Sequence, residues 1–189
     1  MSATRPLIIG IGGTTRAGSS SERCLVAALS HAQALGAATR LFGGEALDAL
    51  PHFNPAQPGE SAIRDALTEA VRACDGLIVA TPGYHGSVSG LVKNALDSLE
   101  GLREDVRPYF DGRAVGLIVT ADGAQAGGTT LSALRGIVHA MRGWPTPYGA
   151  ALNGLGGLFE TDGTWKDPRN GVQIETVAAQ VVAFADRWG

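Results

Sequence analysis

Cysteine, aromatic side chains and charge of one sign are all scarce in this chain. It has 2 cysteines, 4 histidines, 6% aromatic residues and a net charge of −3. Cys24 and Cys74 show no metal-ligand or redox spacing, so a reducing cytoplasm is the expected compartment. The scattered histidines argue against a metal site. No basic face is available to neutralise nucleic-acid phosphates, and we expect no nucleic-acid partner.

Long apolar runs are also missing. Runs such as residues 7–11 are far too short to cross a bilayer, and residues 1–5 contain no signal-peptide core. We therefore expect no membrane partner. The 189 residues suffice for one domain with a full core, expected to span residues 1–189. What the chain does have is 27 glycines, which predict many tight turns between strands and helices.

Short apolar runs alternate with helical periods along the whole chain. Strands are expected at residues 7–11, 38–42, 77–80, 114–120 and 146–152. Helices are expected at 22–35, after an N-cap at Ser61, at 91–99, around 131–141 and at 172–188. Strands separated by helices in this way predict a doubly wound α/β fold, a parallel sheet with helices on both faces.

The loop after the first predicted strand is dense in hydroxyl groups. Between residues 14 and 21 it contains Thr14, Thr15, Arg16, Ser19, Ser20 and Ser21. Hydroxyls and free backbone N–H groups at the start of a helix form a pocket for a phosphate dianion. Arg16 is expected either to pair with that phosphate or to lie across a flat ligand. The alternative, that Ser20 or Ser21 merely caps the helix, leaves the other polar residues unexplained.

A dinucleotide-binding fingerprint is the other interpretation of this loop. It requires G-x-G-x-x-G and an acidic residue at the end of the second strand. Gly10 and Gly12 begin the pattern, but Thr15 stands at the third glycine position and the second predicted strand ends without a carboxylate. The pattern therefore favours a pocket for a terminal phosphate.

Two further loops after predicted strands complete a recognisable set of motifs. Residues 82–97 read P-G-Y-H-G-S-V-S-G-L-V-K-N-A-L-D, and residues 122–128 are rich in glycine. Together with the hydroxyl-rich loop, these segments make the sequence resemble the NAD(P)H-dependent FMN reductase family of the flavodoxin-like fold, which includes bacterial azoreductases and quinone reductases. The family motif G-S-x-R-x-x-S is matched by residues 13–19, and P-E-Y-N-x-S-x-P-G-x-L-K-N-x-x-D by residues 82–97. A glycine-rich loop is matched loosely by residues 122–128. Gly83, His85 and Ser89 depart from the frequent Glu, Asn and Pro.

The resemblance implies a flavodoxin-like five-stranded parallel sheet in the order 2-1-3-4-5, with FMN as cofactor and NADPH or NADH as hydride donor. Thr14, Thr15, Arg16, Ser19, Ser20 and Ser21 would hold the phosphate. The ring would be held by Pro82, Gly83, Tyr84, His85, Gly86 and Ser87 on one edge, and by Asp122, Gly123, Gly127 and Gly128 at its opposite end. Tyr84 would lie near the ring or at a subunit contact. His85 would donate to the pyrimidine edge or be solvated.

The implied activity is that of an NAD(P)H-dependent FMN oxidoreductase, which passes electrons to free flavin, a quinone, or an azo or nitro compound. Hydride transfer is a property of the two rings, so we expect no catalytic side chain. The alternatives are a flavodoxin-type electron carrier or a non-catalytic flavin-binding protein. Such carriers are usually more acidic than this chain. The resemblance also implies a homodimer or homotetramer.

Overall fold

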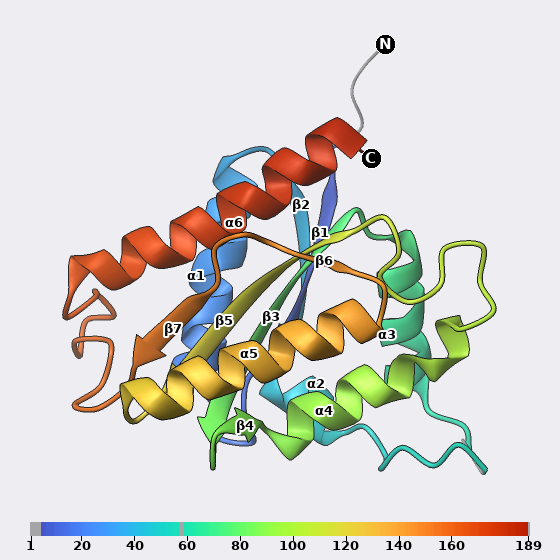
Figure 1. Ribbon diagram of the computed structural model, residues 1–189, viewed down its shortest axis with the longest axis horizontal. Helices are drawn as coiled ribbons and strands as arrows, with labels where there is room; N and C mark the ends of the chain where they lie inside the picture. Colours follow the sequence, from blue (N-terminus) through green and yellow to red (C-terminus); the bar gives the residue numbers. More distant parts are fainter. Residues whose placement is uncertain (1–4, 57–58, 189) are drawn as a thin grey trace.

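Parallel strands form the centre of the protein (Figure 1), whose computed structural model describes residues 5–56 and 59–188. The strands β1 (Leu7–Gly12), β2 (Ala38–Phe42), β3 (Gly76–Tyr84) and β5 (Ala114–Ala121) lie in the order β2-β1-β3-β5. The short strands β6 (Trp144–Pro145) and β7 (Ala150–Asn153) both pair in parallel with β5. Counted as one broken fifth strand, they complete the predicted order 2-1-3-4-5, which is confirmed.

Helices cover both faces of this sheet, as predicted (Figure 1). One face carries α1 (Ser20–Ala34) and α6 (Pro168–Trp188), and the other carries α3 (Ala62–Ala73), α4 (Gly90–Asp97) and α5 (Ala124–Ala140). Alternate residues of each strand enter the two cores, so that Ile9 packs on one side and Ile8 on the other. In the described ranges, none of the helices has the length and apolar character needed to span a membrane.

Several elements differ from the sequence expectation. The short helices α2 (Gly44–Asp48) and η1 (Ser98–Leu102) were not predicted, and β3 extends four residues beyond Ala80. The fifth strand is interrupted between Pro145 and Ala150. Pro147 lies in this gap and has no N–H group to donate to the ladder, which explains why β6 and β7 are separate. Ser61 caps α3 as predicted, since its hydroxyl accepts the Arg64 N–H group at 3.3 Å.

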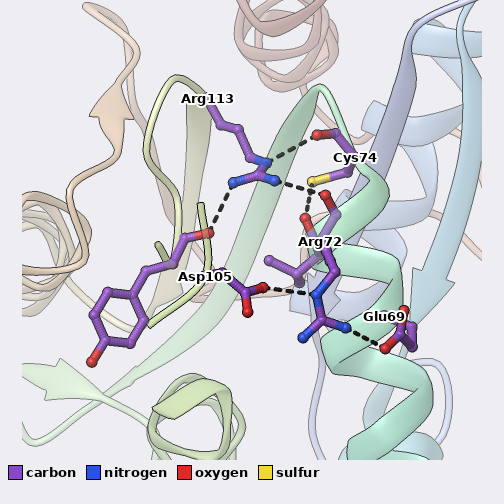
Figure 2. Close-up of polar contacts among 7 residues, drawn as sticks. Glu69, Arg72, Cys74, Asp105 and Arg113 are labelled. Carbon is purple, nitrogen blue, oxygen red and sulfur yellow. Dashed lines mark hydrogen bonds and ion pairs between the residues drawn. The ribbon is translucent and has the colours of Figure 1, made fainter. Parts of the chain in front are cut away.

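A buried arginine anchors the long connection that leads into β5. Figure 2 shows the Arg113 guanidinium directed at backbone carbonyl oxygens near the end of α3. It donates to the carbonyl oxygens of Arg72 and Cys74, both at 2.9 Å, and to that of Tyr109 at 3.0 Å. Arg113 is fully buried, and this burial lowers the pKa of its guanidinium from the usual value. The carbonyl oxygens at the end of a helix carry partial negative charge, which offsets part of the desolvation cost.

Ion pairs on the surface flank this buried group. Arg72 pairs with Asp105 at 2.7 Å and with Glu69 one turn away (Figure 2). The side chains are substantially exposed, so these pairs contribute little to the free energy of unfolding. The buried Arg113 therefore carries most of the polar connection between α3 and the segment before β5.

Replacing Arg113 is expected to destabilise the fold strongly. Arg113→Met removes every donor from the buried carbonyl oxygens, and we expect the free energy of unfolding to fall by about 3 kcal/mol. The matched control is Arg103→Met, because Arg103 forms only surface pairs and its loss should cost less than about 0.5 kcal/mol. Urea unfolding of both variants measures the difference. Equal stability of the two variants would contradict this role.

Cys24 and Cys74 are both free and buried. Burial raises the pKa of the Cys24 thiol to about 12 and that of the Cys74 thiol to about 11. A raised pKa keeps a thiol protonated until the pH approaches the raised value. Both thiols are therefore expected to resist alkylation at about pH 8 in the folded protein and to react in denaturant. Mass spectrometry after iodoacetamide treatment tests this, and rapid labelling of the folded protein would disprove it.

Candidate functional site

The carboxyl ends of β1, β3, β5 and β7 meet around one cleft of about 500 Å³. This edge of a parallel sheet is where open α/β folds bind ligands. Four segments form the walls, and we name them by their residues: the hydroxyl loop (13–19), the Tyr84 hairpin (83–88), the Asp122 turn (122–123) and the Gly154 loop (154–157).

The hydroxyl loop ends at the N-terminus of α1. Ser19 caps the helix: its hydroxyl accepts the Glu22 N–H group at 3.4 Å and lies 3.4 Å from the Ser21 hydroxyl. The cap is thus Ser19 rather than Ser20 or Ser21, and α1 begins two residues earlier than predicted. Ser19, Ser20 and Ser21 all line the cleft. First-turn N–H groups have no partner within the helix, so Ser20 and Ser21 present donors as well as hydroxyls to an anion.

Two residues define the shape of the hydroxyl loop. Thr14 accepts the Arg16 N–H group at 3.1 Å and donates to the Arg16 carbonyl oxygen at 3.3 Å. Glu22 accepts the N–H groups of Gly18 at 3.3 Å and of Gly44 at 3.0 Å. Gly44 must be glycine, because a Cβ there would lie 1.8 Å from the Thr14 carbonyl oxygen. Glu22 therefore ties the end of the loop to the start of α2 while occupying a position close to the anion site.

The second wall is a β-hairpin, where the sequence predicted an irregular loop. Gly83 and Tyr84 at the end of β3 pair with β4 (Ser87–Val88). The two turn residues, His85 and Gly86, have φ values of 52° and 78°. Positive φ at both central positions is what a type I′ turn requires. The Thr81 hydroxyl accepts the Ser89 N–H group at 3.0 Å and ties the hairpin to α4.

Gly83 is closely packed against β5 and α5. A Cβ there would lie 2.9 Å from both the Thr130 hydroxyl and the Ala121 Cβ. The Thr130 hydroxyl is fully buried behind the hairpin and has no hydrogen-bond partner among the described residues. The frequent family residue at this position, glutamate, would therefore require α5 or β5 to shift away from the hairpin. Tyr84 stands at the rim of the cleft and is 56% exposed.

The Asp122 turn differs most from the prediction. α5 begins at Ala124, so Gly127 and Gly128 lie in its first turns rather than in a loop, and neither lines the cleft. Gly123 (φ 116°) lines an adjoining side groove of about 690 Å³. This groove and the cleft share His85, Gly86, Asp122 and Ala126, so the two form one continuous depression.

Eleven predicted residues do line the cleft: Thr14, Arg16, Ser19, Ser20, Ser21, Pro82, Gly83, Tyr84, His85, Gly86 and Asp122. Thr15, Ser87, Gly123, Gly127 and Gly128 do not. Thr15 and Ser87 are exposed. Among the described residues, no group of three or more His, Cys, Asp or Glu side chains is placed to hold a metal ion.

Five lining residues were missed by the sequence analysis: Thr120, Ala121, Ala126, Gly154 and Gly157. The Gly154 loop follows β7, and its Gly154 N–H group donates to the Ala121 carbonyl oxygen at 2.8 Å. Asn153 accepts N–H groups from Gly123 at 3.2 Å and Leu155 at 3.1 Å. The available signal was the run Gly154-Leu155-Gly156-Gly157, a glycine cluster directly after the fifth predicted strand.

Comparison with known proteins agrees with this geometry. A family model described as NADPH-dependent FMN reductase matches residues 6–155. The FMN-dependent NADPH-azoreductase of Staphylococcus aureus (strain USA300) is 34% identical over 122 residues, which are 64% of this chain and 61% of the relative. The aligned region therefore covers less than two thirds of the relative's length.

Two solved structures share the fold. FerB, a flavoenzyme NAD(P)H:(acceptor) oxidoreductase from Paracoccus denitrificans, aligns with a TM-score of 0.75 at 16% identity, covering 97% of this chain and 99% of FerB. The flavodoxin of Streptococcus pneumoniae TIGR4 aligns with a TM-score of 0.62 at 12% identity, covering 94% and 98%. These likenesses confirm the flavodoxin-like fold. Because the family model matches most of the chain, the protein belongs to the NADPH-dependent FMN reductase family.

Proposed function

We propose that the protein is an FMN-dependent NAD(P)H oxidoreductase that reduces free flavin, a quinone, or an azo or nitro compound. The observation that carries the proposal is the joining, in one cleft, of a hydroxyl-rich helix N-terminus and a wall of backbone. The first suits a phosphate dianion and the second suits the edge of a planar ring. Family membership supports the same cofactor.

The residues present fit FMN. At one end, the Ser19 and Ser21 hydroxyls, the first-turn N–H groups of α1 and the Arg16 guanidinium form a donor set typical of phosphate sites. At the other end, Gly83 and Gly86 allow close approach of the backbone to a flat ligand. The volume of about 500 Å³ lies within the range of cofactor clefts.

Bound FMN would supply the redox chemistry, accepting a hydride from NAD(P)H and passing electrons on. The chain's own residues would then bind the cofactor and orient it. Arg16 and the hydroxyl loop hold the phosphate, and the Tyr84 hairpin presents main-chain groups to the ring edge. The side groove, lined by His85, Asp122, Gln125 and Thr129, offers space beside the ring for the nicotinamide or the acceptor. The homodimer or homotetramer that the family resemblance implies stays a prediction.

Reduction by nicotinamide tests the enzyme against the alternatives. The FMN-loaded protein is expected to lose its flavin absorbance rapidly when NADPH or NADH is added without oxygen, with a rate that saturates with nicotinamide concentration. Saturation reports a binding site for the donor. Anaerobic stopped-flow spectroscopy measures it, with a panel of acceptors added afterwards. Slow bleaching that rises linearly with nicotinamide would instead identify a carrier or a flavin-binding protein.

Removing the phosphate contacts tests the hydroxyl loop. The double variant Arg16→Ala, Ser19→Ala is expected to weaken FMN binding by about 1–3 kcal/mol, because a charged partner loses its hydrogen bonds. Titration of the apoprotein by quenching of flavin fluorescence measures the affinity. Arg103→Ala with Ser30→Ala is the matched control, since both residues are exposed and lie outside the cleft.

Because Ser19 caps α1, its loss is expected to destabilise the fold. Thermal unfolding is therefore recorded for both double variants, and the FMN titration is made well below the lower of the two unfolding temperatures. An affinity for FMN equal to that of the control would remove the hydroxyl loop from the site.

A further inference from the structure

A lysine lies beside the Gly154 loop, contributed by a segment far along the chain that shares a groove with Gly18 and Glu22 at the start of α1. Lys166 donates from Nζ to the Gly156 carbonyl oxygen at 2.6 Å, and its backbone N–H group donates to the Leu158 carbonyl oxygen at 3.0 Å. A Cβ on Gly157 would lie 3.5 Å from Lys166 Nζ, and Gly157 itself lines the cleft together with Ser19, Ser20 and Ser21. The ammonium group therefore stands directly beside a cleft-lining residue.

The Gly154 loop is well suited to hold this charge in place. It is bonded to β5 through Gly154 and to the Asp122 turn through Asn153. On its outer side, the rings of Phe159 and Trp165 pack with centroids 4.3 Å apart, and the Arg23 guanidinium of α1 stacks on Phe159 at 3.8 Å. These contacts fasten the segment that carries Lys166 to the first turns of α1, which is the element that begins at the phosphate site.

Charge balance at this end favours a second cation. Glu22 places a carboxylate in the first turn of α1, and a bound phosphate monoester adds a charge of about −1.5 to −2. Arg16 supplies a single positive charge. Within residues 5–56 and 59–188, no carboxylate lies within 4.0 Å of the charged groups of either Arg16 or Lys166. The hydrogen bond to Gly156 uses one of the three ammonium protons, and two remain for another acceptor.

We propose that Lys166, held beside the Gly154 loop, is a binding residue for the phosphate group of the flavin mononucleotide. This inference rests on the proposed function and extends it to a segment that the motifs of the family do not include. As a consequence, two cations, Arg16 and Lys166, would allow the chain to bind a flavin with a terminal phosphate more tightly than a flavin without one.

The test compares FMN with riboflavin, which has the same ring but no phosphate. In Lys166→Met we expect FMN affinity to fall by about tenfold at low ionic strength, as for the loss of one charge-assisted hydrogen bond, with riboflavin affinity unchanged. Lys166→Arg keeps the charge and the donor to Gly156 and is expected to bind FMN nearly as the wild type does. Fluorescence titration of the apoproteins, wild type included, gives the six affinities of the three proteins for FMN and riboflavin.

Lys93→Met is the matched control, because Lys93 is the other lysine of the chain and pairs with Asp97 on α4, outside the cleft. An unchanged FMN affinity in Lys166→Met, or an equal loss for FMN and riboflavin, would overturn the proposal. If the Arg16→Ala, Ser19→Ala variant loses FMN while Lys166→Met does not, the proposed function stands and the role of Lys166 falls. If the wild type binds no FMN, both fall.

Discussion

The close approach of β1 to β3 where the two strands leave the sheet determines the whole site. Gly12 pairs with Ala80 in parallel register, and a Cβ on Gly12 would lie 2.1 Å from the Ala80 carbonyl oxygen. Gly13 then packs against Gly44, since a Cβ on Gly13 would lie 2.8 Å from the Gly44 nitrogen. Because no side chain separates these backbones, the hydroxyl loop starts beside the Tyr84 hairpin. A single small molecule is able to reach both walls for that reason.

Electrostatics at the phosphate end is the second constraint. The N-terminus of α1 attracts an anion, yet Glu22 places a negative charge in the same turn because its carboxylate is needed to hold Gly18 and Gly44. The charge of Arg16, and that of Lys166 as proposed, offset that cost. The structure thus combines a rigid loop with a favourable field at the start of α1.

Much of the fold followed from the sequence, and about two thirds of the predicted site residues line the cleft, for identifiable reasons. Buried parallel strands leave apolar runs, and the motif at residues 82–97 identified the segment of the second wall, although not its hairpin form. Glycine content misled at Gly127 and Gly128, which lie in the first turns of α5 although glycine is a poor helix former. The Gly154 loop was missed because its place in the cleft arises from pairing of β7 with β5, a long-range contact. A fully buried Arg113 is equally invisible in sequence, since arginine is usually exposed.

The central claim is that the N-terminus of α1 receives the phosphate of FMN, and a crystal structure of the protein grown with FMN tests it most directly. The account predicts phosphate oxygens at about 2.7–3.0 Å from the backbone nitrogens of Ser20 and Ser21, with the ring against the Tyr84 hairpin. A flavin bound with its phosphate away from the hydroxyl loop, or a cleft filled by its own side chains in saturating FMN, would contradict it.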